Sequence, residues 1–373
     1  MMPASAPPSG PTFLRRPEVR GALLVGALAL LLALLRAHRA TWPTDLDQWY
    51  FAGRAMLQGR SPYDAVGPAR EFQWSWRLNY PLSTVIFTLP LTLLSVPVAR
   101  IVFSVLGGGV LGYALGKDAF RRVGAVLSAA FLIAVFRNQW SPFYTAAWFV
   151  PLAALLLAAK PNMAVAFVAG VRSWRQFRWI VGIGLAIGVA SLIARPAWPL
   201  EWLMSLREMP RVVSPIMRPF GFLYALALLK WRRPEARLFF ALVCVPQTPS
   251  LYDLLPLFIV TRSTREVLVL SLLTHVLFFT IAALGPFVDF NAYAHRLGEL
   301  SIVVYLPVLF MLLRRPNALD EAAVAATAST PTGFPAGLRA RIEAAARLDV
   351  LLLLANAVAA ILFVWFTTTT NGG

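Results

Sequence analysis

Two carboxylates, Asp45 and Asp47, lie near the start of the longest interval between hydrophobic segments in the first three hundred residues. This interval, residues 41–81, reads TWPTDLDQWYFAGRAMLQGRSPYDAVGPAREFQWSWRLNYP and contains four carboxylates, four arginines and four tryptophans. A carboxylate can take a proton as a general base, and arginines can bind an anionic group. We therefore expect chemistry in this polar, aromatic-rich loop, at a membrane surface.

The apolar residues that follow Asp45 recur at helical spacing, which predicts a short amphipathic helix along the membrane surface. Asp45 lies just before this helix, where a carboxylate commonly caps free backbone N–H groups. The alternative is that Asp45 is a general base that faces the membrane interface. Asp47 would point to a different side of the helix, so the two carboxylates cannot share one role.

The composition of the whole chain is that of a polytopic membrane protein. Of its 373 residues, 58% are hydrophobic and only 14% are charged, with a mean hydropathy of +0.67. A soluble domain of this length would need a more charged surface. The net charge of +17 is scattered through short loops, as in membrane anchors, which excludes the clustered basic face of a nucleic-acid-binding module. The single cysteine, Cys244, excludes an intramolecular disulfide.

Repeated apolar runs near the ~20 residues that span a bilayer predict an all-α, polytopic transmembrane bundle of about 11–13 segments. Prolines interrupt the runs between residues 123 and 171, where we expect broken or re-entrant segments. The predicted segments are residues 20–38, 81–97, 98–116, 123–136, 143–159, 161–171, 178–194, 217–231, 236–247, 252–262, 266–285, 297–313 and 348–367.

Lysines and arginines in short loops predict the orientation of these segments. With the N-terminus in the cytoplasm, most arginine-rich loops fall inside the cell and the first loop, residues 40–80, falls outside. Residues 117–122 are an exception, because their cations would fall outside. Either the third and fourth segments are misdrawn or these cations serve something anionic.

The chain divides into four expected regions. They are a disordered cytoplasmic N-terminus at 1–19, a transmembrane domain at 20–315, a cytoplasmic linker with a short amphipathic helix at 316–347, and a terminal transmembrane helix with its tail at 348–373. Within the transmembrane domain, Gly108, Gly112 and Gly116 recur at four-residue spacing, which predicts close packing of one helix against another.

The first loop resembles that of the polyprenol-phosphate-dependent mannosyltransferases of glycosyltransferase family 87, which belong to the GT-C class of integral membrane glycosyltransferases. The pattern DLDQWYFAGRAMLQGRSPYD, followed by NYPLS and an apolar run that ends in LLSVP, carries this resemblance. In it, the matching positions are Asp45, Ala52, Leu57, Gly59, Pro62, Tyr63, Tyr80 and Pro81.

Two later stretches also resemble the family, and the resemblance covers roughly residues 20–260. NQWSP followed by AAKPN places Gln139 and Lys160 in matching positions, and PQTPSLYD does so for Tyr252 and Asp253. The chain departs from the family at Asn138, where a glycine is usual, and after Pro81, where a second proline is common. Neither departure involves Asp45.

The resemblance implies transfer of a hexose, mannose by analogy, from a polyprenyl-phosphate donor to a lipid or glycan acceptor, with inversion. Asp45 would be the base and Asp47 would support it. The developing phosphate charge needs fixed cations, for which the candidates are Lys160, Arg54, Arg207 and Arg211. The alternatives are a snorkelling lysine and lipid-anchoring arginines. Tryptophans 74, 76, 198 and 202 could stack on sugar faces or only mark the interface.

The remaining predicted substrate contacts are Tyr63, Tyr80, Gln139, Tyr252 and Asp253. An acidic residue at the end of a span, such as Asp253, is costly unless it binds a substrate or pairs with an arginine. We expect no cofactor. The alternative is a divalent metal at the D-x-D spacing of Asp45 and Asp47, which we do not favour because that motif serves nucleotide-sugar enzymes with soluble folds.

The expected location is a bacterial inner membrane, with the active site on the extracytoplasmic side. The alternative is a transporter or flippase of lipids or lipid-linked sugars that does no chemistry. Transporters commonly show paired repeats and charges near the bilayer midplane. The sequence shows no such repeat, and most of its charges lie at loop ends.

Overall fold

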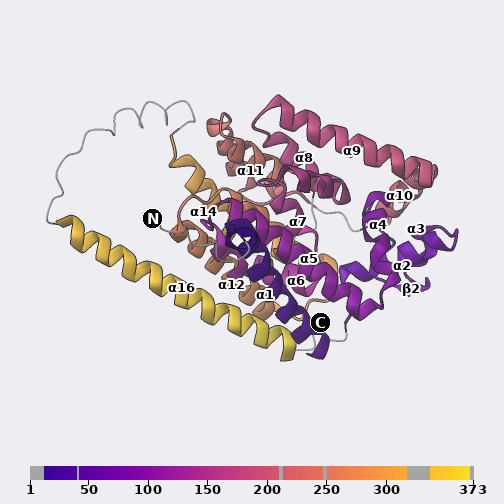
Figure 1. Cartoon of the computed structure of the whole chain (residues 1–373), viewed down its shortest axis with the longest axis horizontal. Coiled ribbons are helices and arrows are strands. Elements are labelled where there is room, and N and C mark those ends of the chain that lie inside the picture. The colour runs from indigo at the N-terminus through magenta and orange to yellow at the C-terminus, as the bar shows by residue number, and fades with distance from the viewer. Residues whose placement is uncertain (1–11, 40–41, 210–212, 247–249, 317–336, 370–373) are drawn as a thin grey trace, which may run out of the picture.

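A computed structural model describes residues 12–39, 42–209, 213–246, 250–316 and 337–369. These residues are almost entirely helical, which confirms the predicted all-α class (Figure 1). The strands β1 (Val66–Gly67) and β2 (Phe72–Gln73) form one short parallel pair inside the first loop.

The helical elements, with η for 3-10 segments, follow the chain in a fixed order. They are η1 Thr12–Arg15, α1 Pro17–Arg39, α2 Asp45–Leu57, α3 Pro62–Ala65, α4 Leu82–Thr88, η2 Leu89–Leu93, α5 Val96–Lys117, η3 Val123–Leu127, α6 Ala129–Phe136, α7 Ser141–Ala146, η4 Pro151–Ala159, α8 Pro161–Ala169, α9 Trp174–Ala194, α10 Trp198–Arg207, η5 Pro215–Met217, η6 Gly221–Lys230, α11 Pro234–Cys244, η7 Leu251–Ile259, α12 Thr264–Leu284, α13 Phe290–Leu300, α14 Ile302–Leu313 and α16 Gly337–Thr369.

Among the described residues, six helices are long and apolar enough to cross a membrane, so the chain is a multi-pass membrane protein. They are Pro17–Arg39, Val96–Lys117, Trp174–Ala194, Thr264–Leu284, Phe290–Leu313 and Arg347–Thr369. The other predicted segments are shorter helices and 3-10 segments. Pro142, Pro151 and Pro161 each lie in the first turn of one of them, because proline lacks the N–H that a helix interior needs.

Helices α1 and α5 pack against each other through the predicted glycines. A Cβ atom on Gly108 would lie 2.6 Å from the Cβ of Ala29, and one on Gly112 would overlap the carbonyl oxygen of Gly21. A Cβ on Gly116 would overlap the backbone of Glu18. Residues near the start of α1 thus lie beside residues near the end of α5, so the two helices are antiparallel. The prediction of close packing is confirmed.

The predicted span at 81–97 does not cross the bundle. Because α5 is antiparallel to α1, it begins at the end of the molecule where α1 stops and where the first loop lies. Helices α4 and η2 join the loop to this same end, and Tyr50 in α2 donates a hydrogen bond of 2.7 Å to the carbonyl of Leu94. In Figure 1, α2, α3, α4 and α10 gather at one end of the molecule. We call it the loop end.

This correction explains the exceptional cations at 117–122. Gly116 lies beside Glu18, so these residues share the end of the bundle at which α1 begins. Arg122 pairs with Asp118 at 2.5 Å and donates to the carbonyl of Phe258 at 3.0 Å. Other arginines that bind backbone carbonyls or carboxylates lie with it, and we call this the basic end. They include Arg237, Arg262 and Arg315. The second predicted segment, residues 81–97, was therefore the one in error, and the cations of 117–122 lie with the other arginines, as the charge rule expects.

The predicted span at 143–159 is two segments that run in opposite directions. The chain passes through α7 to Trp148, whose ring lies 4.7 Å from the guanidinium of Arg172. It then returns through η4 to Lys160, which lies at the loop end near Asp45. Either correction alone would reverse the predicted sides of all later loops. They offset each other, so the later loops keep their predicted sides.

Both ends of the chain differ from expectation. Residues 12–19, expected to be disordered, form η1 and the start of α1. The predicted surface helix at 337–348 and the terminal span are one continuous helix, α16. Residues 1–11 and most of the predicted linker, 317–336, lie outside the described residues.

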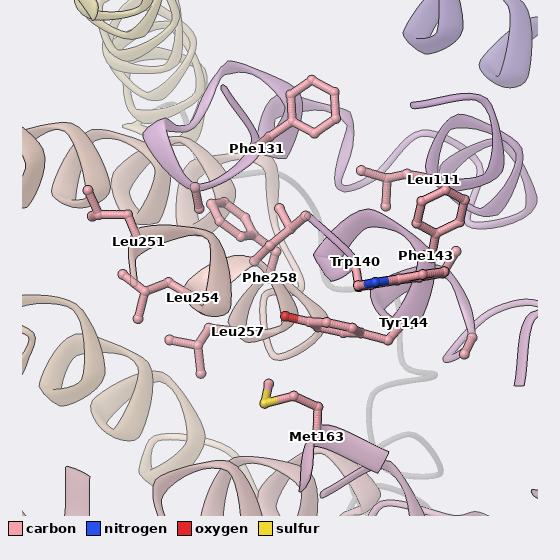
Figure 2. Packing of buried hydrophobic residues seen from close by; sticks show 14 of the residues in the cluster. Leu111, Phe131, Trp140, Phe143, Tyr144, Met163, Leu251, Leu254, Leu257 and Phe258 are labelled. Carbon is pink, nitrogen blue, oxygen red and sulfur yellow. The ribbon is translucent and has the colours of Figure 1, made fainter. Parts of the chain in front are cut away.

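The core lies between α5, α6, α7 and η7, where aromatic and branched side chains fill the bundle. Trp140 packs on Phe103 and Phe143, with ring centroids 5.1 and 5.3 Å apart. Figure 2 shows Tyr144 below Trp140, with its hydroxyl pointing toward the segment that carries Leu254 and Leu257. This packing fixes the side chains that reach the loop end.

Candidate functional site

Asp45 is the first residue of α2, and Thr44 is the N-cap. The interpretation of Asp45 as the cap is therefore wrong. Asp47 caps the helix instead, because its Oδ2 accepts a hydrogen bond of 2.7 Å from the backbone N–H of Thr44. Because Asp47 does the capping, the carboxylate of Asp45 is available for another role.

The Asp45 carboxylate is partly buried and held by one amide. Gln139 donates a hydrogen bond from Nε2 to Asp45 Oδ2. The backbone N–H of Asp45 donates to the carbonyl of Arg137 at 3.2 Å. Burial raises the pKa of Asp45 to about 6, and the positive charges of Arg137 and Lys160 oppose this rise. A carboxylate with such a pKa releases and takes a proton near neutral pH.

The turn that carries Gln139 depends on a left-handed residue. Asn138 has a φ of +53°, a conformation that glycine and then asparagine adopt most readily. Its side chain donates hydrogen bonds of 2.8 Å to the carbonyl of Arg100 and to Ser104 Oγ. An asparagine at this position, where the resemblance leads one to expect glycine, therefore keeps the same backbone geometry and adds two contacts.

Lys160 and Asp253 form a buried ion pair beside Asp45. Lys160 Nζ lies 2.7 Å from Asp253 Oδ1, which also accepts a hydrogen bond of 2.8 Å from the Tyr144 hydroxyl. The ring of Tyr252 lies 5.3 Å from Lys160 Nζ, as a cation–π partner. Asp253 Oδ2 is buried and has no hydrogen-bond partner among the described residues. It is therefore an acceptor that a substrate hydroxyl can satisfy.

Tyr80 completes the cluster from the end of the first loop. Its ring packs edge-on against Trp49, with centroids 4.9 Å apart. Burial and the charges of Asp45 and Asp253 raise the pKa of Tyr80 well above its ordinary value, so its hydroxyl stays protonated. The phenol is thus a hydrogen-bond donor near both carboxylates.

Asp47 belongs to a different contact set on the other side of α2, as its position two residues from Asp45 predicts. Its carboxylate is buried and accepts two hydrogen bonds from the guanidinium of Arg100. With its bond to Thr44, this pairing fixes the start of α2 against α5. In the structure Asp47 supports the position of Asp45 through the helix.

Three other predicted site residues lie away from this cluster. Arg54 and Arg207 are exposed on α2 and α10. Tyr63 is buried near the ion pair of Arg195 and Glu201, where burial raises its pKa beyond its usual range. Arg211 lies outside the described residues.

The tryptophans of the loop end pack against protein groups. Trp202 donates from Nε1 to the carbonyl of Asn79 at 2.9 Å and packs beside Trp198. Trp74 stacks on Phe72, and Trp76 packs on Phe290 of α13. These contacts join the first loop to α10 and α13.

Two members of the site were not anticipated from the sequence. Tyr144 lies in an apolar run, and only its hydroxyl distinguishes it from the neighbouring core residues. Arg137 stacks on Trp42, with its guanidinium 4.3 Å from the ring centroid, and its charge acts on Asp45. The sequence signal for Arg137 was its position two residues before Gln139. Within the described parts of the chain, no group of three or more His, Cys, Asp or Glu side chains could hold a metal ion.

Comparison with known proteins finds no matching family model, no matching curated protein and no matching solved structure.

Proposed function

We propose that this protein is an integral membrane glycosyltransferase of the GT-C class. It transfers a hexose, mannose in the first instance, from a polyprenyl-phosphate donor to a lipid or glycan acceptor on the extracytoplasmic side of a bacterial inner membrane. Asp45 is the general base. The resemblance of the first loop to glycosyltransferase family 87 supplies the reaction class.

One observation carries the proposal. Three stretches of sequence that resemble the family, each far from the others in the chain, bring several of their matched residues to one place at the loop end. The matched residues that meet there are Asp45, Tyr80, Gln139, Lys160, Tyr252 and Asp253. Polar and charged residues that converge on a carboxylate with a perturbed pKa are typical of functional sites.

The proposed reaction is a single displacement at the anomeric carbon. The acceptor oxygen forms a bond to this carbon as the bond to the donor phosphate oxygen breaks, and the configuration inverts. Asp45 takes the proton of the acceptor hydroxyl, and the polyprenyl phosphate leaves with the electron pair. Asp45 then releases its proton to water.

The surroundings of Asp45 suit this role. With a pKa of about 6, the carboxylate is mostly ionised at neutral pH yet basic enough to accept a proton in the transition state. Gln139 can only donate to it through Nε2, so the amide holds one carboxylate oxygen and leaves the other for the acceptor hydroxyl.

The ion pair of Lys160 and Asp253 gives the site a second substrate contact. Asp253 Oδ2 accepts a hydroxyl of the acceptor, while Tyr144 and Lys160 hold Oδ1 in place. In this assignment Lys160 orients Asp253 and contributes positive charge near the leaving phosphate.

Incubation of the purified protein with radiolabelled polyprenyl-phosphate mannose and a membrane acceptor extract tests the proposal. We expect mannose in a new product together with release of polyprenyl phosphate. A panel of other lipid-phosphate hexoses then identifies the preferred sugar. Movement of intact donor across a vesicle membrane without release of lipid phosphate would instead identify a transporter.

A further inference from the structure

A pocket lies between the loop ends of α1 and α5, beside the turn at Asn138. Its polar lining comes from Arg36, Arg100, Ser104 and Asn138, and its apolar lining includes Ala33, Ala37 and Ile101. Arg36 and the apolar lining residues have no part in the proposed reaction, whereas Arg100 holds Asp47 and Asn138 forms the turn that carries Gln139.

The pocket follows from the way α1 and α5 pack. Glycines at 108, 112 and 116 bring the two helices into backbone contact toward the basic end. Toward the loop end the same face of α5 carries Ser104, Ile101 and Arg100. Their larger side chains hold the helices apart where a glycine would let them meet.

Arg36 is a buried cation with unused hydrogen-bonding capacity. Only 3% of its surface is exposed. It donates from Nη2 to the carbonyl of Trp42 at 2.6 Å, while its Nε has no partner among the described residues. A buried guanidinium is costly unless an anion pairs with it.

The pocket holds an excess of positive charge. The charged groups that act on Arg36 are Arg100, Arg137 and a single carboxylate, Asp47. Asp47 is already bound by Arg100 and by the N–H of Thr44. The guanidiniums of Arg36 and Arg137 both lie over the ring of Trp42, 4.4 and 4.3 Å from its centroid. Asp47 is therefore the one carboxylate shared by Arg36, Arg100 and Arg137. Asp45 also interacts electrostatically with Arg137.

The chemistry of the pocket selects its ligand. Guanidinium groups bind phosphate oxygens with charge-assisted, often bidentate hydrogen bonds. The apolar rim leads to lipid-facing side chains such as Leu34 and Val98, which are 48% and 45% exposed. Because Arg36 and Arg100 lie at the ends of spans, they sit at the depth of lipid headgroups. A free phosphate ion would leave the apolar rim unused.

We infer that this pocket binds the phosphate group of a membrane lipid, with its hydrocarbon chain along the rim between α1 and α5. Two lipids carry this chemistry, namely a polyprenyl phosphate and a resident anionic phospholipid. The inference does not rest on the proposed transferase activity, because it concerns binding alone.

The experiment measures lipid binding to the delipidated full-length protein in detergent. The probes are decaprenyl phosphate, phosphatidylglycerol, and the neutral decaprenol and diacylglycerol of matched chain length. We expect each phosphate-bearing lipid to bind at least about tenfold more tightly than its neutral counterpart. The tighter of the two phosphate lipids identifies the source of the ligand.

Paired variants place the binding in the pocket. Arg36→Gln removes the buried charge, and we expect it to weaken phosphate-lipid binding by about tenfold or more. Arg39→Gln removes an exposed arginine from the same helix and should leave the dissociation constant within about twofold of wild type. Ala37→Trp fills the rim from an exposed position without changing charge, and should weaken binding as well even if Arg36→Gln fails to fold.

Equal binding of phosphate-bearing and neutral lipids would overturn the inference. So would equal affinity of Arg36→Gln and Arg39→Gln, or undiminished binding to Ala37→Trp. Because the measurement needs no turnover, lipid binding without any sugar transfer would reject the transferase alone.

Discussion

At the scale of single residues, the neighbours of Asp45 set its chemistry. Burial favours the neutral carboxyl group, and two cations nearby favour the carboxylate, with the balance at a pKa of about 6. Asp47, two residues on, lies beside Arg100 and supports the helix. The same residue type thus has two roles, because α2 directs the two side chains to opposite sides.

The pH dependence of sugar transfer tests this assignment. A general base works only when it is deprotonated, so the rate should fall as the pH falls through about 6 and level off above it. The measurement is the transfer rate at saturating donor across this range, with any residual rate of Asp45→Asn as the control. A rate that rises as the pH falls through this region would contradict the role of Asp45.

At the scale of elements, the seam between α1 and α5 fixes the frame of the loop end. The glycines of this seam could be predicted from the sequence, because small residues at four-residue spacing in a membrane helix commonly mark close packing against another helix. The direction in which α5 crosses the bundle could not be predicted from the sequence. Residues 82–93 are apolar enough for a span, and only the contacts of α5 with α1 show that they stay at the loop end.

Substitution of Gly112 tests the importance of this seam. Gly112→Ala places a Cβ atom against the carbonyl of Gly21, so we expect a loss of stability of about 1–3 kcal/mol. The control is Gly182→Ala in α9, where a Cβ would meet nothing within 4 Å. There the better helix propensity of alanine should leave the stability unchanged or raised. Thermal unfolding in detergent measures both, and equal midpoints would show that the seam is not close-packed.

At the scale of the whole molecule, the chain separates its charges between two ends. The arginines that bind carbonyls and carboxylates around Arg122, Arg237 and Arg315 lie at the basic end, and the cluster around Asp45 lies at the loop end. From the positive-inside rule we propose that the basic end faces the cytoplasm.

Cysteine labelling tests this orientation. Cys244 is the single native cysteine, so Cys244→Ala provides a background without thiols. A membrane-impermeant maleimide should label Gln73→Cys, exposed in the first loop, in cells with an opened outer membrane. It should label Arg175→Cys, exposed at the start of α9, only after the inner membrane is permeabilised. The reverse pattern would place the loop end in the cytoplasm.

Much of the architecture could be predicted from the sequence. Hydrophobic length located the six helices that are long enough to cross a membrane among the described residues, because the bilayer imposes a minimum apolar length on each span. Short segments escaped this rule, as at 81–97 and 143–159, because apolar length does not say whether a segment crosses or turns back. The contacts of buried polar groups were harder to predict than the course of these segments. The bond of Tyr144 to Asp253 and the stacking of Arg137 on Trp42 depend on segments that meet only in the fold.

The assignment of Asp45 as the catalytic base is the central claim, and Asp45→Asn tests it most directly. The amide oxygen of asparagine can still accept from Gln139, and loss of a buried charge does not cost stability. A carboxyl group whose pKa rises on folding destabilises the fold once the pH exceeds its ordinary value of 3.8. At neutral pH the variant should therefore unfold at the same temperature as wild type or a higher one.

The decisive measurement is the rate of mannose transfer by folded Asp45→Asn from a polyprenyl-phosphate donor, beside wild type. We expect a loss of about 10²–10⁴-fold, the usual contribution of a general base. Transfer at the wild-type rate by a folded Asp45→Asn protein would contradict the account.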